Sequence, residues 1–517
     1  MVLIYNVPEE NNNRDFWVTK YGLILAMAGN AIGLGNFLRF PVQAAENGGG
    51  AFLLPYIICF ICIGIPLMWI EWGIGRHGGS IGKGTTFGIS TKFNSNKVLQ
   101  IASLLGIWIP LIISIYYIYI ESWTLGYSLK SLFGELQSDI SATTEKMSFF
   151  KNIFSEYTGN FNQTNSFLIP SVFAYGCFLL TLLINYGILY RGISRGIEKF
   201  VKFAMPALFF MSLFMVVYVF TIKTSISSAI EGFDFLWSPD FSSLTNPKVW
   251  IAAAGQVFFT LSLGFGAIVT YASFIKKDED IALSGLTSAS LNELIEVVFG
   301  GSIVIPAAVA FLGVAGAVLI AQSGAFTIGF IAMPAIFDGL PLGGTIGFIW
   351  FFLLFIAGLT SSIGILQPVI TFVKEEFALS QKKSSLIVIL VIFFFANFVI
   401  FVPEILEEFD FWAGTILLVV LALVEIAIYV IYISPKSHVD EINRSSLIKI
   451  PKIYNKIFKY FLPLFLIILI FAWLIQDINS ANSMIFKVSF WSKLARILLL
   501  SIFLGIFGLV FKKVFNK

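Results

Sequence analysis

Apolar residues recur along this chain in long runs that are separated by short polar connections. A run of about 20 apolar residues can cross roughly 30 Å of hydrocarbon as a helix. Windows of that length predict about twelve spanning helices, so we expect an all-α integral membrane protein. The predicted spans are residues 18–45, 50–75, 98–133, 168–189, 197–221, 248–275, 283–315, 344–377, 383–403, 410–434, 457–475 and 489–511.

Two of these spans are interrupted by glycine and polar residues in the same way. The first reads Gly29-Asn30-Ala31-Ile32-Gly33-Leu34-Gly35-Asn36, and the sixth reads Thr260-Leu261-Ser262-Leu263-Gly264-Phe265-Gly266. Backbone groups freed by a break in lipid are tolerated only where protein buries them or where they line a cavity. Close helix packing explains either glycine pair taken alone. Because the interruptions fall in the first span of each of two five-helix halves, they predict a binding site at the middle of an inverted repeat.

Side chains with neutral oxygens gather around both breaks. Asn36, Thr260 and Asn292 belong to this group, and Thr360 and Ser361 in the eighth span join them. Hard cations bind oxygen ligands, and free carbonyls at helix ends add more of them. A single hydroxyl in a spanning helix usually bonds the carbonyl four residues earlier, so each residue alone also has a purely structural explanation.

The composition agrees with a membrane protein and removes several alternatives. Of the 517 residues, 57% are hydrophobic and only 12% are charged, about half the charged share of a typical soluble domain. That share excludes most soluble enzymes. The 56 phenylalanines and three cysteines exclude a disordered chain and a disulfide scaffold. A net charge of +3 gives no basic stripe, so we expect no nucleic-acid partner.

The loop charges predict the orientation. Lysine and arginine are in roughly three-to-one excess on the side that carries the N-terminus, which places both termini in the cytoplasm. The N-terminus lacks the charged start, apolar core and cleavage site of a secretory signal, so we expect the first span to be kept. We expect a multi-pass protein of the cell (inner) membrane. The predicted parts are a cytoplasmic segment, 1–17, a first repeat of helices 1–5, 18–221, a second repeat of helices 6–10, 248–434, and helices 11 and 12, 457–511.

Two connections on the predicted outer side are long. Residues 134–167 are polar and contain Asn162-Gln163-Thr164, a glycosylation pattern that has meaning only in a eukaryotic secretory route. Residues 316–343 are rich in Gly, Ala and Pro and are too apolar for a free loop. We expect this second connection to fold back as a re-entrant cap within the second repeat.

Several ordered motifs resemble those of the neurotransmitter:sodium symporter family. They are Asn30–Pro41 (NAIGLGNFLRFP), Glu46–Phe52 (ENGGGAF), Tyr116-Tyr117, Phe258–Gly264 (FFTLSLG), Leu291-Asn292 and Gly358–Ser362 (GLTSS). The resemblance extends over nearly the whole chain, and its motifs are long and specific. It implies a LeuT-like five-plus-five inverted repeat with discontinuous helices 1 and 6. The activity it implies is sodium-coupled import of a small neutral (aliphatic) amino acid by alternating access.

The resemblance also implies two sodium sites and one substrate site. The first sodium site would combine the carbonyls of Ala31 and Thr260, the side chains of Asn36, Thr260 and Asn292, and the substrate carboxylate. The second would combine the carbonyls of Gly29, Ile32 and Ala357 with the hydroxyls of Thr360 and Ser361. The amino acid would lie against Asn30, Ala31, Leu34, Gly35, Ile113, Tyr117, Phe259, Thr260, Ser262, Phe265, Ser361 and Ile365.

Charges inside spans are functional candidates, and the resemblance matches two of them to an outer gate. Arg39 and Asp410 would close this gate above Phe259 and Tyr117. A static ion pair that locks two helices together would also explain the two charges.

The inner gate of the family is matched by Arg14 and Trp17. Their acidic partner in the family is usually Asp, whereas this chain has Glu375 at that position, followed by Glu376. The longer carboxylate should still reach, and either glutamate could pair with Arg14.

Two further residues bear on the transported ions and on the substrate. Glu296 lies one helical turn after Asn292, where chloride-dependent relatives have a small neutral residue. A fixed carboxylate there predicts chloride independence, and its protonation during the return step would permit proton countertransport. Ile113 stands where LeuT-like chains carry Val. We therefore expect a preference shifted towards Ala, Val or Gly relative to Leu, because overfilling a tight pocket is costly.

Two other function classes are compatible with such a fold, an ion channel and an amino-acid sensor that binds without transporting. A channel would need a continuous polar stripe, whereas the polar groups here cluster at one depth. A sensor normally has an appended signalling domain, and the loops are too short for one. The expected partners are an amino acid of the Ala, Val, Gly or Leu class and the lipid bilayer. A homodimer is compatible with the sequence, and no enzymatic activity is expected.

Overall fold

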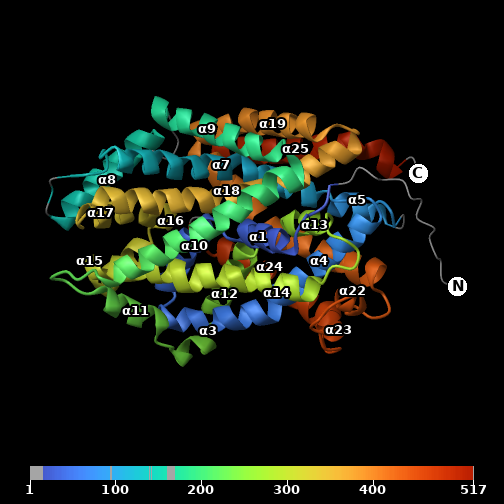
Figure 1. The fold of residues 1–517 in the computed structure, drawn as a ribbon, viewed down its shortest axis with the longest axis horizontal. Helices are drawn as coiled ribbons and strands as arrows, with labels where there is room; N and C mark the ends of the chain where they lie inside the picture. The colour runs from blue at the N-terminus through green and yellow to red at the C-terminus, as the bar shows by residue number, and fades with distance from the viewer. Residues whose placement is uncertain are drawn as a thin grey trace.

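The protein is a bundle of long helices that run roughly side by side along the longest axis of the molecule (Figure 1). The computed structural model describes residues 15–93, 96–138, 140, 142–159, 169–481 and 483–515. Within these residues the extended pairing is limited to one isolated bridge between Lys223 and Ser228. The fold is therefore all-α, as the apolar runs predict.

Ten helices in the described part of the chain are long and apolar enough to cross a membrane. Four of them are single α-helices, namely α9 (Val172–Leu189), α18 (Gly343–Glu376), α19 (Gln381–Phe401) and α25 (Phe490–Phe515). Three others are Gly50–Ser80, made of α3 (Gly50–Cys59), η1 (Phe60–Gly64) and α4 (Ile65–Ser80), Lys97–Leu132, made of α6 (Lys97–Ala102) and α7 (Leu105–Leu132), and Ile193–Phe220, made of η2 (Ile193–Ile197) and α10 (Glu198–Phe220). The last three are Ile281–Ala321, made of α14 (Ile281–Glu293), η4 (Leu294–Gly301) and α15 (Ser302–Ala321), Pro403–Ile433, made of α20 (Pro403–Phe411), η6 (Trp412–Ile416), α21 (Leu417–Ile428) and η7 (Tyr429–Ile433), and Tyr454–Ile478, made of α23 (Tyr454–Lys456), η8 (Ile457–Phe461) and α24 (Leu462–Ile478).

The first and sixth predicted spans are each divided into two helices. α1 (Lys20–Ala31) and α2 (Leu34–Glu46) are bent by 48° and count as an eleventh span if taken together. α12 (Pro247–Thr260) and α13 (Ala267–Ala272) are separated by the non-helical residues 261–266, and neither is long enough to span alone. A total of twelve spans stays a prediction, because it depends on counting both divided pairs.

Side chains fix the starts of several helices at the loops. The Thr19 hydroxyl accepts a hydrogen bond from a first-turn N–H of α1, and Asp280 and Ser380 do the same for α14 and α19. These contacts satisfy N–H groups that a helix start leaves free. The long interiors are apolar on all sides, which is expected where neighbouring helices or lipid cover every face.

Short helices cover the two ends of the bundle. α5 (Thr86–Ser90) and α22 (Asp440–Asn443) lie at the same end as the end of α25, whereas α8 (Thr143–Thr158), α11 (Ala229–Trp237) and α17 (Met333–Asp338) lie at the opposite end (Figure 1). A 3-10 turn, η3 (Phe241–Thr245), follows α11.

The segment predicted as a re-entrant cap forms the end of α15 and a second helical stretch that packs back onto the bundle. That stretch consists of α16 (Ala325–Thr327), η5 (Ile328–Ala332) and α17, which contact α2, α8 and α18. Met333 and Phe337 of α17 are buried. The apolar composition of this connection therefore reflects packing against neighbouring helices.

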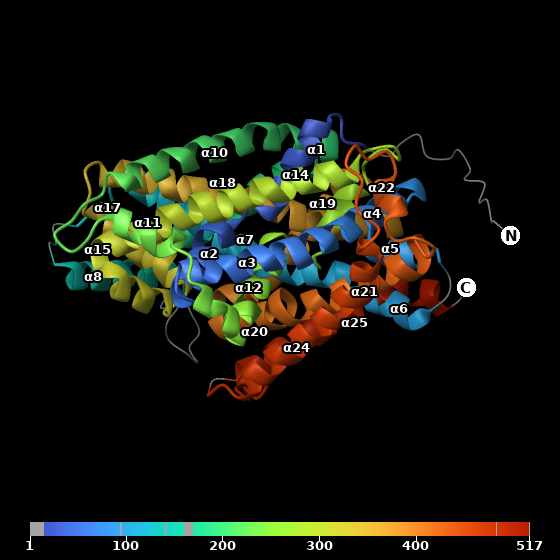
Figure 2. The ribbon, with the colours of Figure 1, turned by 90° about the horizontal axis from the view of Figure 1, so that it is seen from below.

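The centre of the bundle is formed by α7 and α18, which pack against each other along most of their length and contact α1, α2, α13 or α21. α20, α24 and α25 lie along one side of the bundle (Figure 2), and α20 contacts α25 directly. The two divided helices thus meet the centre of the bundle, and the last two helices lie outside it.

Candidate substrate and sodium sites

The break between α1 and α2 is held by side chains from within and across the helix. The Asn36 Oδ1 atom accepts a hydrogen bond from the Gly33 N–H at 2.8 Å, and the Leu34 N–H donates to the Tyr117 hydroxyl at 3.2 Å. The carbonyl end of α1 and the N–H end of α2 therefore face the same small region. Such ends favour a cation and an anion, respectively.

The break between α12 and α13 has a backbone that favours glycine. Gly264 has φ +71, and a Cβ there would lie 2.3 Å from the Leu418 carbonyl oxygen. Its N–H donates to Glu71 Oε1 at 2.8 Å. Ser262 also has positive φ, 54°, and its hydroxyl donates to the Asn30 carbonyl at 3.1 Å. The two breaks are thus in direct contact with each other.

The side chains predicted for the first sodium site form one buried cluster. Asn36 Nδ2 donates to Asn292 Oδ1 at 2.9 Å and to Thr260 Oγ1 at 3.3 Å, and Asn292 Nδ2 donates to Thr260 Oγ1 at 2.9 Å. All three residues are at most 1% exposed. Their partners come from α2, α12 and α14, so this cluster joins both divided helices to a third. Ala31, the fourth predicted member, ends α1.

Glu296 adds a carboxylate to this cluster. Its Oε2 atom accepts hydrogen bonds from the hydroxyls of Thr260 and Tyr56, the second at 2.9 Å, and its Oε1 accepts from Gln256. Tyr56 also donates to Glu293 at 3.1 Å. The cluster predicted for the first sodium site therefore has a fully buried carboxylic group in direct contact with two of its members, Thr260 and Asn292.

The oxygens predicted for the second sodium site gather around Thr360. Its hydroxyl lies 3.0 Å from the Ala357 carbonyl and 3.4 Å from the Ile32 carbonyl. A Cβ on Gly29 would lie 3.2 Å from the Thr360 Cβ, so the α1 backbone passes close to this hydroxyl. Ser361, the fifth member, donates instead to the Asn30 carbonyl at 3.1 Å.

Several predicted substrate residues line the space between the breaks. A Cβ on Gly35 would lie 2.5 Å from the Phe259 ring, so only glycine permits this approach. The side chain of Asn30 is fully buried, and neither its oxygen nor its nitrogen has a hydrogen-bond partner among the described residues. Buried amides are normally hydrogen-bonded, so this pair of unsatisfied atoms is compatible with a polar ligand.

Three further apolar members of the predicted substrate site come from three different elements. Ile113 on α7 and Ile365 on α18 are each 2% exposed, and these two helices pack together. Phe265 lies in the α12–α13 break, and its ring centroid is 6.5 Å from that of Phe259. These side chains supply apolar surface beside the polar helix ends.

A pocket of about 460 Å³ lies directly beyond Tyr117 and Phe259, with the exposed Glu46 at its rim. Arg39 and Asp410 both line it. The Arg39 guanidinium lies over the Phe259 ring, 4.3 Å from its centroid, and the Tyr116 hydroxyl donates to Asp410 at 2.8 Å. No ion pair joins these two charges in the described structure, although both line the same pocket.

The predicted inner-gate residues lie at the other end of the site. The Trp17 indole N–H donates to the Tyr271 carbonyl of α13 at 3.0 Å. Glu375 lies 3.8 Å from Lys83, and Glu376 forms a closer ion pair with Lys513 at 2.5 Å. The Trp17 contact packs the chain before α1 against α13, the second half of the divided sixth span. Arg14, like the Asn162 glycosylation pattern, lies outside the described residues.

Two buried glutamates, Glu71 and Glu121, are not among the site residues predicted from the sequence. Glu71 holds the α12–α13 break, and Glu121 accepts a hydrogen bond at 3.3 Å from Asn185, which in turn accepts one from Ser362 beside the second sodium cluster. Both glutamates lie within predicted apolar spans. A carboxylate in such a span is itself a functional signal, and it could have identified these positions.

Comparison with known proteins gives a consistent result. The model of the sodium:neurotransmitter symporter family matches residues 14–516. An uncharacterized sodium-dependent transporter of Haemophilus influenzae is 30% identical over 477 residues, 89% of this chain and 98% of the relative. The sodium-dependent neutral amino acid transporter B(0)AT3 of Mus musculus is 32% identical over 276 residues, 51% of this chain and 43% of the relative.

Among solved structures, that of MhsT in complex with L-phenylalanine is similar with a TM-score of 0.74 and 28% identity, and the match covers 89% of this chain and 99% of that one. The shared fold extends over nearly all of both chains. The protein therefore belongs to the sodium:neurotransmitter symporter family, as a multi-pass membrane protein with the fold of secondary transporters rather than of enzymes.

Proposed function

We propose that this protein is a sodium-coupled symporter that imports a small neutral aliphatic amino acid by alternating access and without chloride. The observation that carries the proposal is the contact between two divided helices around a cluster of buried neutral oxygens. This arrangement supplies ligands for both a cation and a zwitterion in one place.

The two oxygen clusters support two sodium ions. Asn36, Thr260 and Asn292 would hold the first ion, with the amino-acid carboxylate completing its shell. Thr360 and the nearby carbonyls of Ile32 and Ala357 would hold the second. Neutral oxygens suit a hard monovalent cation, because several of them can surround it without an excess of negative charge.

The helix ends support a zwitterionic substrate. Its carboxylate would meet the N–H end of α2 and the Tyr117 hydroxyl, which is already in contact with the Leu34 N–H. Its ammonium would meet carbonyl ends near Asn30. The side-chain oxygen and nitrogen of Asn30 have no hydrogen-bond partner among the described residues, so they are available to a ligand. Alternating access would then move a bundle of spans 1, 2, 6 and 7 against a scaffold of spans 3, 4, 8 and 9.

The residue at position 113 supports a small substrate. Ile113 is buried at the apolar side of the site, and one additional methylene in a tight pocket costs about 1–3 kcal/mol. MhsT, by contrast, is described in complex with L-phenylalanine, which has a larger side chain.

Competition by unlabelled amino acids against sodium-dependent binding of labelled alanine will rank the substrates. We expect Ala, Val and Gly to compete more strongly than Leu, and Ile113→Val to improve competition by Leu by roughly tenfold, because it restores about one methylene of space. Binding that is tightest for Leu or Trp in the unchanged protein would contradict the assignment to small substrates.

Membrane placement follows from the same proposal. The loop charges predict cytoplasmic termini in the cell (inner) membrane, so the pocket beyond Phe259 would face the outside and the Trp17 contact would close the inside. Import would therefore begin from a state close to the one described.

A further inference from the structure

The helix that carries Asp410 is unusually acidic. α20 contains Glu404, Glu407, Glu408 and Asp410 within nine residues, and a π-helical turn, η6, follows it directly. Irregular helical turns of this kind are frequent at functional sites. Only Asp410 of these four lines the pocket beyond Tyr117 and Phe259, which we call the outer pocket. The other three are held by the last part of the chain.

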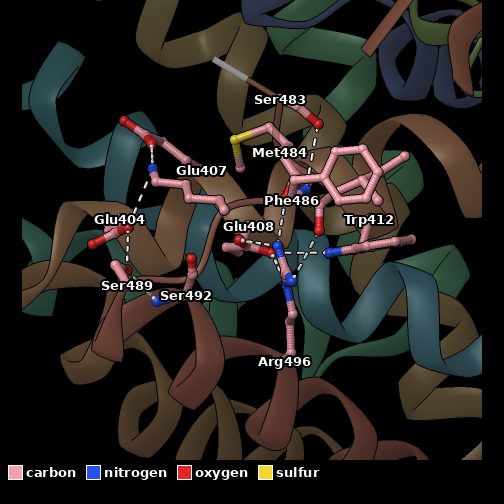
Figure 3. Close-up of polar contacts among 12 residues, drawn as sticks. Glu404, Glu407, Glu408, Trp412, Ser483, Met484, Phe486, Ser489, Ser492 and Arg496 are labelled. Carbon is pink, nitrogen blue, oxygen red and sulfur yellow. Dashed lines mark hydrogen bonds and ion pairs between the residues drawn. The ribbon is translucent and has the colours of Figure 1, made fainter. Parts of the chain in front are cut away.

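Two side chains, those of Arg496 and Trp412, donate hydrogen bonds to Glu408 (Figure 3). Arg496 of α25 donates through Nε to Oε2 and through Nη2 to Oε1, both at 3.0 Å, so the pair is bidentate. The Trp412 indole N–H donates to Oε2 at 2.9 Å. The Glu408 side chain is fully buried, whereas that of Arg496 is 30% exposed. Bidentate arginine–carboxylate pairs fix orientation as well as distance.

Arg496 is itself held by the loop between α24 and α25. It donates to the carbonyls of Ile485 and Met484, the first at 3.2 Å. The N–H groups of the same two residues donate to Asp477 at the end of α24, at 3.1 and 2.9 Å. The guanidinium therefore has little freedom to follow α20 if that helix turns.

Two neighbouring glutamates reinforce the contact (Figure 3). Lys487 lies 2.8 Å from Glu407 and 3.3 Å from Glu404, and the Ser489 hydroxyl donates to Glu404. The Glu407 side chain is 51% exposed, where ion pairs are weaker, whereas that of Glu404 is 10% exposed. Among the described ion pairs of α20, the Glu408–Arg496 pair is the bidentate one and has the fully buried carboxylate.

Asp410 lies on the opposite face of the same helix. Two residues of α-helix turn through about 200°, so Asp410 faces the outer pocket when Glu408 faces α25. There Asp410 accepts from Tyr116 at 2.8 Å, and a Cβ on Gly414 would lie 2.6 Å from its Oδ1. Gly414 follows on the same helical run, whereas Tyr116 belongs to α7, so a small rotation of α20 would move Asp410 away from the Tyr116 hydroxyl.

We propose that Arg496 and Glu408 are positioning residues that orient α20 and hold Asp410 at the outer pocket. The proposal rests on the proposed function, in which Asp410 takes part in closing that pocket over the substrate. It gives α25, which lies outside both predicted repeats, a defined effect on substrate retention.

A double-mutant cycle with Asp410 tests this role. We expect Arg496→Met to raise the dissociation rate of labelled alanine from the purified, sodium-loaded protein by roughly tenfold, within the range of coupled residues. In the Asp410→Asn background the same change should alter that rate less than about twofold. Arg496→Lys keeps the charge but loses the bidentate hydrogen bonds to Glu408, so it should raise the dissociation rate by less. It serves as a second variant if Arg496→Met folds poorly.

Lys493→Met is the matched control, since it removes an exposed charge from the same helix and should leave the dissociation rate unchanged. Equal effects of Arg496→Met with and without Asp410 would overturn the positioning role, and so would an unchanged rate in the single variant. Absence of sodium-dependent alanine binding in the unchanged protein would instead contradict the proposed function.

Discussion

Replacing Asn36 by alanine will lower the affinities for sodium and for alanine together. Asn36 spans the first break, because its Oδ1 accepts from the Gly33 N–H while its Nδ2 reaches Asn292 and Thr260. Loss of one hydrogen-bonding group to a charged ligand costs about 1.5–3 kcal/mol, or roughly 10- to 150-fold in affinity. Equilibrium binding of labelled alanine over a sodium titration will measure both effects.

The control for this variant is Asn47→Ala, which changes the same residue type at the other end of α2. The Asn47 amide donates only to the Gln43 carbonyl in the described structure, at 2.8 Å, so both affinities should remain within about twofold. A loss of alanine affinity in Asn36→Ala with an unchanged sodium dependence would contradict a shared site for ion and substrate.

Replacing Glu296 by serine will make transport depend on chloride. The Glu296 carboxylate contacts Thr260 and is fully buried, so its removal takes a negative charge from beside a predicted sodium ion. Transport by Glu296→Ser in chloride-free buffer should fall by more than about tenfold, equivalent to at least about 1.4 kcal/mol, and added chloride should restore most of it.

Uptake by the unchanged protein should be the same in chloride and gluconate buffers. Glu296→Gln tests the charge with little change of shape, and it should lose activity as Glu296→Ser does in the absence of chloride. Collapse of transport by the unchanged protein in gluconate would show that the carboxylate does not replace an anion.

The two helix breaks and most of the polar cluster could be predicted from sequence, because both produce local contrast. Glycine and neutral polar residues such as Asn36 and Thr260 stand out inside apolar runs, where free backbone groups and side-chain amides need partners. Their contact with each other depends on an inverted repeat, which the matching positions of the two breaks indicated.

Contacts between distant segments could not be predicted in the same way. Glu71 meets the Gly264 N–H across 193 positions, and Arg496 meets Glu408 across 88. Apolar periodicity reports the length of a helix and its exposed face, but it carries no information on which helices are neighbours. Glu408 also falls in the short connection predicted between the spans 383–403 and 410–434, where a charge looks like an ordinary surface charge.

Arg39 and Asp410, the residues predicted for the outer gate, depend on conformation as well as on sequence. Arg39 and Asp410 are recognisable because charges are costly inside apolar spans. Their present partners, the Phe259 ring and the Tyr116 hydroxyl, depend on the conformation that the protein adopts. A sequence describes all conformations of a transporter at once, so it cannot specify which contacts a single state contains.

Two sodium ions entering with a zwitterion would carry two charges into the cell. At about 2.3 kcal/mol per charge and 100 mV, an inside-negative potential of that size supplies about 4.6 kcal/mol, enough for roughly a thousandfold accumulation. Neither a channel nor a sensor concentrates its ligand in this way.

Uptake of labelled alanine into proteoliposomes therefore tests the central claim most directly, with sodium or choline outside and an imposed inside-negative potential. The account predicts transient accumulation above the external alanine concentration with sodium, a further increase with the potential, and no accumulation with choline. Equal uptake in sodium and choline, or binding without internal accumulation, would contradict it.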